Sequence, residues 1–338
     1  MKTLGIYLTI ALTFTGLGCN GKRTEGASSN DGSENAQTLS ERIIGDFHAD
    51  SAYEHIARQV GFGPRVPGSE GHKACRDYII RTLAAYAADT IIVQDAEVTA
   101  FTGEVLPITN ILASYKPGES RRILLAAHWD TRPWADMESS EDSRNRPIPG
   151  ANDGGSGVGV LLEIARNFQL RDPEVGVDLL FVDAEDYGNS AGFGDKTDTW
   201  CLGTQYWVDH MPYANGAVRP VYGILLDMVG GRNARFHQEM FSLEYAPNVT
   251  AKIWAEAASL GYGNIFINSP GGAVTDDHIF LSRAGIPTAD IIETINEETA
   301  NFPPTWHTHE DRLENIDKKS LEAVGRTVLN VVYKEKSK

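Results

Sequence analysis

Short apolar runs and amphipathic stretches alternate along most of the chain. Four short, mostly apolar runs have the length and character of buried strands: residues 122–127, 177–182, 222–226 and 286–292. Three segments carry apolar residues at helical spacing: residues 161–168, 253–260 and 321–331. A further helix is predicted after Ser69, whose hydroxyl can cap it. This alternation predicts a single α/β domain with a mostly parallel central sheet and helices on both faces.

The first residues follow a different pattern. Residues 4–17 are mostly apolar, a run too short to span a membrane as a helix but suited to the core of a signal peptide over residues 1–18. The small residue before Cys19 resembles the lipobox of bacterial lipoproteins, although Gly16 stands where leucine is usual. A lipid anchor on Cys19 is therefore expected, with a plain secretory signal as the alternative.

Residues 19–38 are rich in Gly, Ser, Asn and Glu and contain few apolar side chains, which predicts a flexible tether before a folded domain over residues 39–338. This organisation is typical of a bacterial protein that is exported to the periplasm and anchored to a membrane. Because an exported compartment permits disulfides, Cys75 and Cys201 are expected either to form one or to be buried free thiols.

Composition and charge exclude some classes of function. Hydrophobic residues make up 41% of the chain and charged residues 22%, which is typical of a soluble globular protein rather than a disordered one. The chain has 30 basic and 46 acidic residues and a formal net charge of −16. Because such a charge repels phosphate backbones, nucleic acid is not an expected partner.

Polar residues stand where the predicted strands end. They are His128 and Asp130, Glu185 and Asp186, Asp227, Asp153 at the start of a helix, and His307 after the last strand. In open α/β sheets the ligand site lies beyond the carboxyl ends of the strands, so these side chains are expected to converge. Carboxylates and imidazoles without a cysteine cluster suit zinc or a similar ion. The alternative at this point is an ordinary surface cluster of acids.

Five segments carry a resemblance to a known superfamily: 127–132, 150–158, 181–186, 226–227 and 306–308. In this order they resemble the zinc-dependent aminopeptidase superfamily, which has a phosphorylase/hydrolase-like α/β fold. Within it the chain is most similar to the animal-type glutaminyl-peptide cyclotransferases. The features that indicate this branch are Trp306 directly before His307, residues 276–279 before a helix, and Phe302 on the loop that leads to Trp306.

The resemblance implies a role for each matching residue. Asp153, Asp186 and His307 would bind a single zinc ion, and Glu185 would be the acid/base. Asp227 and Asp276 would form a hydrogen-bonded pair beside it. The chain differs from the animal pattern at two positions, because Asp186 replaces glutamate and Asp290 replaces histidine.

The implied reaction converts the N-terminal glutamine of a peptide or protein to pyroglutamate and releases ammonia. Trp200, Phe302 and Trp306 are expected to wall a narrow pocket for this side chain. His309, Glu310 and Asp311, which follow the ligand loop, are expected to be solvated.

Two other functions remain open. In the aminopeptidase branch, residues that match His128 and Asp227 hold a second metal, so a two-zinc aminopeptidase is the main alternative. A binding protein on a decayed peptidase scaffold is a third hypothesis, disfavoured because Glu185 and all proposed ligands are present.

Overall fold

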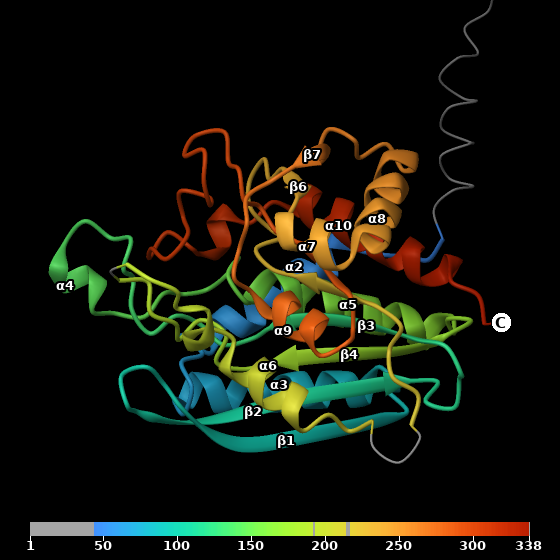
Figure 1. The fold of residues 1–338 in the computed structure, drawn as a ribbon, viewed down its shortest axis with the longest axis horizontal. Helices are drawn as coiled ribbons and strands as arrows, with labels where there is room; N and C mark the ends of the chain where they lie inside the picture. The colour runs from blue at the N-terminus through green and yellow to red at the C-terminus, as the bar shows by residue number, and fades with distance from the viewer. Residues whose placement is uncertain (1–43, 192, 214–216, 338) are drawn as a thin grey trace, which may run out of the picture. The chain divides into compact units, whose positions relative to one another are not determined.

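A mixed six-stranded sheet lies at the centre of the computed structural model, in the order β1-β2-β4-β3-β5-β8. Figure 1 shows β1, β2, β4 and β3 side by side. Its strands are β1 (Thr90–Thr99), β2 (Val105–Tyr115), β3 (Arg122–His128), β4 (Gly176–Val182), β5 (Gly223–Leu226) and β8 (Thr288–Ile291). Strands β4, β3, β5 and β8 are parallel, whereas β1 and β2 are joined to them by antiparallel pairing. The predicted α/β fold with a mostly parallel sheet is confirmed.

The four predicted strands are β3, β4, β5 and β8. Every residue of β3 and β4 is buried, because helices cover both faces of the sheet, and this explains the continuous apolar runs. Strands β1 and β2 were not predicted. The edge strand β1 is largely exposed, and its short apolar stretch, residues 91–93, is followed by Gln94, Asp95 and Glu97, so it lacks the longer apolar run of a buried strand.

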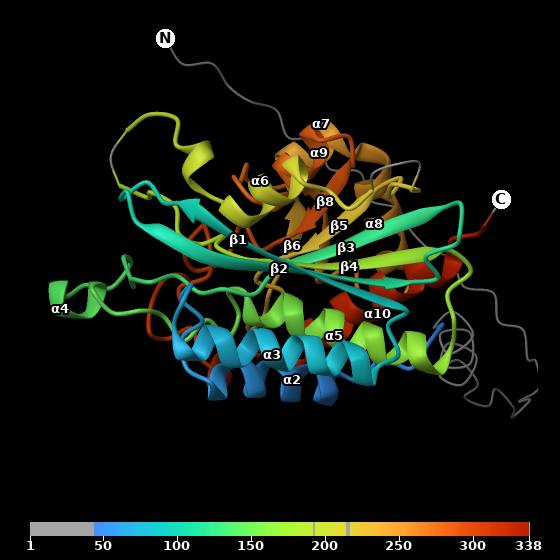
Figure 2. The same ribbon diagram turned by 90° about the horizontal axis from the view of Figure 1, so that it is seen from below.

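The helices form one layer on each side of the sheet (Figure 2). One face is covered by α2 (Ala49–Gly61), α3 (Glu70–Ala85), α5 (Gly155–Leu170) and α10 (Lys318–Lys334). The opposite face is covered by α6 (Leu202–Asp209), α7 (Met240–Tyr245) and α9 (Asp277–Arg283). Helix α8 (Pro247–Ser259) packs against α10 and β8. Ser69 caps α3 as predicted, because its hydroxyl accepts a hydrogen bond from His72 N at 3.1 Å.

Successive residues of each buried strand enter different hydrophobic clusters. Ile123, Leu125 and Ala127 of β3 pack into the cluster under α2, α3, α5 and α10. Leu124 and Ala126 point the other way, into the cluster that includes residues of α6 and α9. This alternation follows from the two-residue period of a strand, and it fixes the register in which polar residues emerge at the strand ends.

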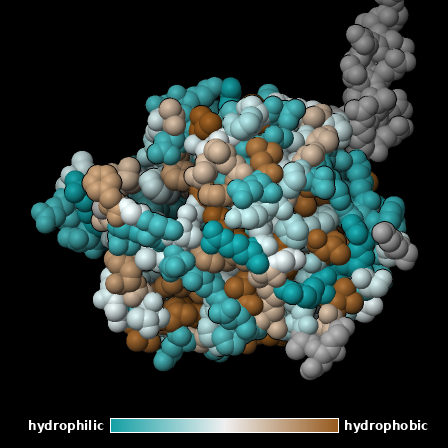
Figure 3. Space-filling view, in the orientation of Figure 1, coloured by the Kyte–Doolittle hydropathy of each residue, from teal (hydrophilic) through white to brown (hydrophobic). Residues whose placement is uncertain are grey.

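Short elements complete the fold. They are α4 (Glu141–Arg144), the two-stranded sheet of β6 (Phe236–Gln238) and β7 (Phe266–Pro270), and the 3₁₀ turns Thr197–Thr199 and Leu313–Asn315. Helix α4 projects from the body at the tip of a long loop (Figure 1). The face shown in Figure 3 mixes hydrophilic and hydrophobic residues.

The structure describes residues 44–191, 193–213 and 217–337, which belong to the compact unit Leu39–Lys338. The predicted signal peptide, the tether and Cys19 lie outside the described residues. Within the described part, no helix has the length and apolar character needed to cross a membrane. Cys75 and Cys201 are both buried free thiols, so of the two alternatives the structure shows the unbridged one.

Candidate active site

The polar residues at the strand ends surround a cavity of about 490 Å³. Every residue predicted to bind metal, bind substrate or transfer a proton lines it: Asp153, Glu185, Asp186, Trp200, Asp227, Asp276, Phe302, Trp306 and His307. The sheet explains this convergence. Because β3, β4 and β5 are parallel, their carboxyl ends meet at one edge, and residues far apart in sequence become neighbours.

Asp153 is held by the turn that leads into α5. Gly154 has a φ of +78°, and a Cβ atom there would lie 2.5 Å from the carbonyl oxygen of Asp130, so the turn requires glycine. Asn152 N and Asp153 N donate hydrogen bonds to the Asp311 carboxylate at 2.7 and 3.0 Å. Asp311 is only 1% exposed, so the expectation that it is solvated is wrong: these two N–H groups bind its carboxylate inside the protein.

Asp153, Asp186 and His307 form the first of two histidine–carboxylate groups, with ligand atoms within 4.8 Å of one another. His307 Nε2 lies 3.3 Å from Asp186 Oδ1 and 3.8 Å from Asp153 Oδ2. Its Nδ1 lies 2.9 Å from Asp136 Oδ1, which directs Nε2 towards the carboxylates. Asp186 Oδ2 is buried and has no hydrogen-bond partner. Two carboxylates, one imidazole and a free buried oxygen fit a zinc ion.

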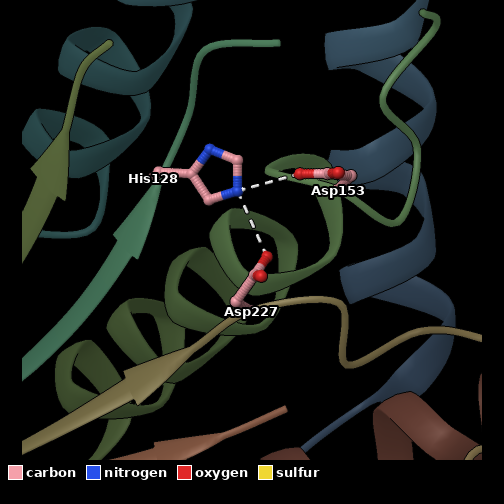
Figure 4. Close-up of side chains that lie close together, drawn as sticks. All are labelled: His128, Asp153 and Asp227. Carbon is pink, nitrogen blue, oxygen red and sulfur yellow. Dashed lines mark hydrogen bonds and ion pairs between the residues drawn. The ribbon is translucent and has the colours of Figure 1, made fainter. Parts of the chain in front are cut away.

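His128, Asp153 and Asp227 form the second group, which shares Asp153 with the first (Figure 4). His128 Nε2 lies 3.2 Å from Asp153 Oδ1 and 3.1 Å from Asp227 Oδ1, and its Nδ1 lies 3.4 Å from Asp130 Oδ1. Burial by itself lowers the pKa of His128, but the hydrogen bonds to these carboxylates outweigh burial and raise it well above the ordinary value. In this arrangement both ring nitrogens have carboxylate partners.

Glu185 lies beside the first group and faces the cavity. Its backbone N–H donates to Asp130 Oδ1 at 3.1 Å, and its Oε1 lies 3.4 Å from the Cys201 thiol. Burial raises the pKa of Glu185 well above the usual range despite the nearby His128, and the charge of Asp276 adds to the rise. A buried carboxyl with a raised pKa is suited to take up and return a proton near neutral pH.

Asp276 is the N-cap of α9 and belongs to a buried group with Glu185 and Cys201. The resemblance implied a hydrogen bond between Asp276 and Asp227, but Asp276 Oδ1 accepts from Asp277 N at 2.5 Å and Asp276 Oδ2 is buried without a hydrogen-bond partner. Asp227 instead pairs with His128, a stronger partner for a carboxylate. Burial, followed by the charge of Asp227, raises the pKa of Asp276 to about 6.

Three half-buried aromatic residues wall the cavity, as their predicted role requires. Trp306 stacks on His307, with ring centroids 3.8 Å apart, and Phe302 lies 4.5 Å from Trp306. Trp200 is nearly parallel to the His307 ring at 6.4 Å. The aromatic wall and the histidine therefore form one continuous surface.

Arg132 and Asp136 were missed by sequence reasoning. Arg132 ends one of the motifs that carry the resemblance, and Asp136 follows it by four residues. The Arg132 guanidinium lies 2.7 Å from Asp136 and 3.1 Å from Asp186. The available signal was the four-residue spacing of opposite charges, which does not by itself indicate a contact with the proposed metal ligands.

Fold and site together define a zinc exopeptidase-like class of enzyme. A model of peptidase family M28 matches residues 110–332, and the chain belongs to this family. A glutaminyl cyclase from Bacteroides thetaiotaomicron, solved with N-acetylhistamine, is 48% identical, with a TM-score of 0.83 over 87% of this chain and 100% of that chain. A Zn-dependent exopeptidase from Parabacteroides distasonis is 47% identical, with a TM-score of 0.81 over 86% and 99%.

A third relative comes from animals. Glutaminyl-peptide cyclotransferase from Bos taurus is 23% identical, over 78% of this chain and 76% of that protein. The resemblance drawn from the sequence is therefore confirmed, and the chain is an enzyme. Family membership, the zinc-dependent neighbour and the donor set support a zinc ion at this site.

Proposed function

We propose that this enzyme is a glutaminyl cyclase that converts N-terminal glutamine of peptides and proteins to pyroglutamate. The observation that carries the proposal is the placement of Glu185 and the proposed metal ligands in a cavity walled by Trp200, Phe302 and Trp306. Such a cavity suits one small side chain held against an acid/base. The names of the bacterial and animal relatives support the same reaction.

The reaction joins two groups of one residue. The α-amine nitrogen attacks the side-chain amide carbon, a new C–N bond closes the five-membered ring, and the bond to the amide nitrogen breaks. Glu185 accepts the proton that the amine loses and returns it to the departing nitrogen, which leaves as ammonia. Asp153, Asp186 and His307 would hold zinc, which when bound polarises the amide carbonyl and stabilises the charge that develops on its oxygen.

The aromatic side chains orient the glutamine and exclude water. Phe302 and Trp306 form a wall that continues into the His307 ring, so a side chain packed against it is brought beside the proposed metal ligands. Exclusion of water matters because a water molecule in place of the amine would hydrolyse the amide instead of closing the ring.

The count of zinc ions separates the main proposal from the second candidate. We propose one zinc, at Asp153, Asp186 and His307. A two-metal exopeptidase would bind a second zinc at His128, Asp153 and Asp227. The geometry of this second group and the similarity to a Zn-dependent exopeptidase support this second candidate.

The test uses two peptides that differ only in their first residue, glutamine or leucine. The cyclase proposal predicts that the glutamine peptide loses the mass of one ammonia and keeps its length, while the leucine peptide is unchanged. Release of free leucine or free glutamine would instead indicate the exopeptidase. A Glu185→Gln enzyme prepared in the same way is the control for contaminating activity. If the protein itself forms the product, this variant must form much less of it than the wild type does.

We also propose, from the sequence, that the protein is exported and anchored through a lipid on Cys19. Wild-type protein expressed in a bacterium is then expected in the membrane fraction. Cys19→Ser is expected either to stay unprocessed or to appear in the soluble fraction with unchanged kcat and KM. Wild-type activity found entirely in the soluble fraction would leave only the secretory signal.

A further inference from the structure

Arg132 is a fully buried arginine whose guanidinium reaches four parts of the site. Its Nη1 donates to the backbone oxygen and to Oδ1 of Asp186, both at 3.1 Å. Its Nε and Nη2 donate to the two carboxylate oxygens of Asp136 at 2.9 and 2.7 Å. Its Nη2 also lies 3.3 Å from the Gly188 oxygen and 3.2 Å from Ser190 Oγ. A guanidinium suits this task because its five N–H groups have a fixed planar geometry.

The contact with Asp186 selects one carboxylate oxygen. Arg132 holds Oδ1 and the backbone oxygen, whereas Oδ2 is buried and has no partner. Arg132 therefore holds Asp186 at its backbone oxygen and at one oxygen of its carboxylate. This leaves one oxygen of Asp186 available for a cation and prevents the carboxylate from turning away.

The contact with Asp136 reaches a second proposed ligand. Asp136 accepts the arginine fork and also lies 2.9 Å from His307 Nδ1. Because Asp136 is fixed by two hydrogen bonds from Arg132, the orientation of the His307 ring depends on the same guanidinium.

The flat faces of the guanidinium contact the aromatic wall. The Arg132 Cζ atom lies 4.9 Å from the centre of the Trp200 ring and 5.1 Å from that of Trp134. Trp200 lines the cavity, so the group that fixes Asp186 and His307 also supports a wall of the proposed glutamine pocket.

We propose that Arg132 is a positioning residue that fixes two of the three proposed zinc ligands and the Trp200 wall in one arrangement, so that zinc retention and pocket shape depend on it together. The inference rests on the ligand set of the proposed function. It requires no direct contact between Arg132 and the substrate.

A positioning role and a purely electrostatic role of Arg132 predict opposite changes in zinc binding when the residue is replaced. A positive charge beside a metal ligand repels a bound cation, so removing it would tighten zinc binding if charge were the main effect. If positioning dominates, removing it frees Asp186 and Asp136 to rotate, and zinc is lost faster. Lysine retains the charge but cannot donate to both carboxylates in the same fork.

The experiment measures zinc release to an excess of chelator from zinc-loaded wild type, Arg132→Lys and Arg132→Gln. Changing an outer partner of a metal ligand typically lowers metal affinity about 10–100-fold. We expect this loss to appear in the release rate, so both variants should release zinc about 10–100 times faster than wild type. Unchanged or slower release in Arg132→Gln would overturn the proposal.

Arg122→Lys is the matched control. Arg122 is also buried and also forms a two-bonded fork, to Asp178 at 3.0 and 2.6 Å, but it begins β3 whereas Arg132 follows the end of that strand. Its zinc release is expected to match wild type. Equal acceleration in both lysine variants would show that general loosening of the fold, rather than positioning, is the cause.

A double variant covers the case in which single variants fail to fold. Arg132→Gln with Asp136→Asn removes both charges of this ion pair, so the net charge is unchanged; of the two carboxylates that Arg132 contacts, only Asp186 keeps its charge. Faster zinc release is expected; wild-type release would overturn the proposal. Near-UV circular dichroism of the zinc-loaded variants, with Trp200→Phe as reference, is expected to show loss of the Trp200 signal.

These readouts do not require turnover. Absence of pyroglutamate formation by the wild-type enzyme would remove the proposed function and leave the order of zinc-release rates intact. Equally fast zinc release from the wild type and all variants would overturn the positioning role of Arg132 but would leave the proposed function untouched.

Discussion

The two histidine–carboxylate groups contain the same types of residue and share Asp153, but their histidines are in different surroundings. His128 does not line the cavity, and both its ring nitrogens have carboxylate partners within 3.4 Å. His307 lines the cavity, and its ring nitrogens also lie near carboxylates, Nδ1 2.9 Å from Asp136 and Nε2 3.3 Å from Asp186, but both of these carboxylates accept hydrogen bonds from Arg132. The ligand inventory is thus nearly symmetric, while the hydrogen bonding is not.

This difference is our reason for proposing one ion rather than two. In the His128 group, an imidazolium can neutralise Asp153 and Asp227 without a metal. In the His307 group, Arg132 and Asp136 hold the ligands from behind and leave Asp186 Oδ2 unpartnered. The predictions below test this asymmetry.

The largest effect on zinc binding is expected from single substitutions of the two histidines. His307→Ala removes the imidazole ligand and is expected to weaken zinc binding by more than about 100-fold, beyond the range for outer partners. His128→Gln should retain one zinc per chain. Zinc analysis after dialysis measures both, and stoichiometric zinc in His307→Ala with loss in His128→Gln would reverse the assignment.

Glu185→Gln is expected to retain zinc and to lose about 10²–10⁴-fold in kcat, because the amide has nearly the same size but cannot accept a proton. Zinc content and single-turnover rates separate the two effects. Near-normal turnover would show that another group is the acid/base.

Asp311→Asn tests the residue that serves both groups through Asp153. One of the two N–H groups at Asn152 and Asp153 would then face the NH₂ of the new amide instead of an oxygen. Zinc affinity is expected to fall about 10–100-fold. The measurement is a competition titration against a chelator, with Asp317→Asn at the exposed cap of α10 as the control. Equal affinities in the two variants would mean that Asp311 does not position Asp153.

Trp306→Leu tests the wall that continues only into the His307 group. An aromatic contact contributes about 0.5–1.5 kcal/mol beyond burial, so KM for a glutamine peptide is expected to rise about 2–13-fold. The value of kcat should change less, and zinc should be retained. A fall in kcat at constant KM would mean that Trp306 acts on the reacting atoms rather than on binding.

His55 shows what burial does to a histidine that has no carboxylate partner. Its Nδ1 lies 2.6 Å from the Tyr78 hydroxyl, and burial lowers its pKa to about 4. The unfolded chain takes up this proton near pH 6.5, so the associated stability is present above that pH and is lost as pH falls towards 4, by up to about 3 kcal/mol. Urea unfolding of wild type and His55→Gln at several pH values measures this stability. If the free energy of unfolding depends on pH in the same way in both proteins, His55 is not the group responsible.

The sequence determined the central sheet well because burial on both faces leaves a direct signal. The runs that became β3 and β4 are apolar at every inner position except Asp178, which pairs with Arg122, so no other element explains them as simply. The edge strand β1 escaped prediction because an exposed strand is free to carry Asp95 and Glu97. Its pairing with β2 is a tertiary event that leaves little trace in local composition.

The same contrast applies to the site. Residues that follow apolar strands, such as Asp186 and Asp227, were found because their place on the sheet follows from the strand order. Asp136 and Asp311 lie on loops, and their roles depend on which backbone or ring nitrogen the folded loop brings to them. Asp311 in particular follows two polar residues and has the local sequence of a solvated turn.

The most direct test is anomalous diffraction at the zinc edge from crystals of the purified protein. The account predicts one strong peak bounded by Asp153, Asp186 and His307, with His128 bonded to carboxylates and no comparable peak beside it. Two peaks of equal height on either side of Asp153 would contradict it and would favour the two-metal exopeptidase.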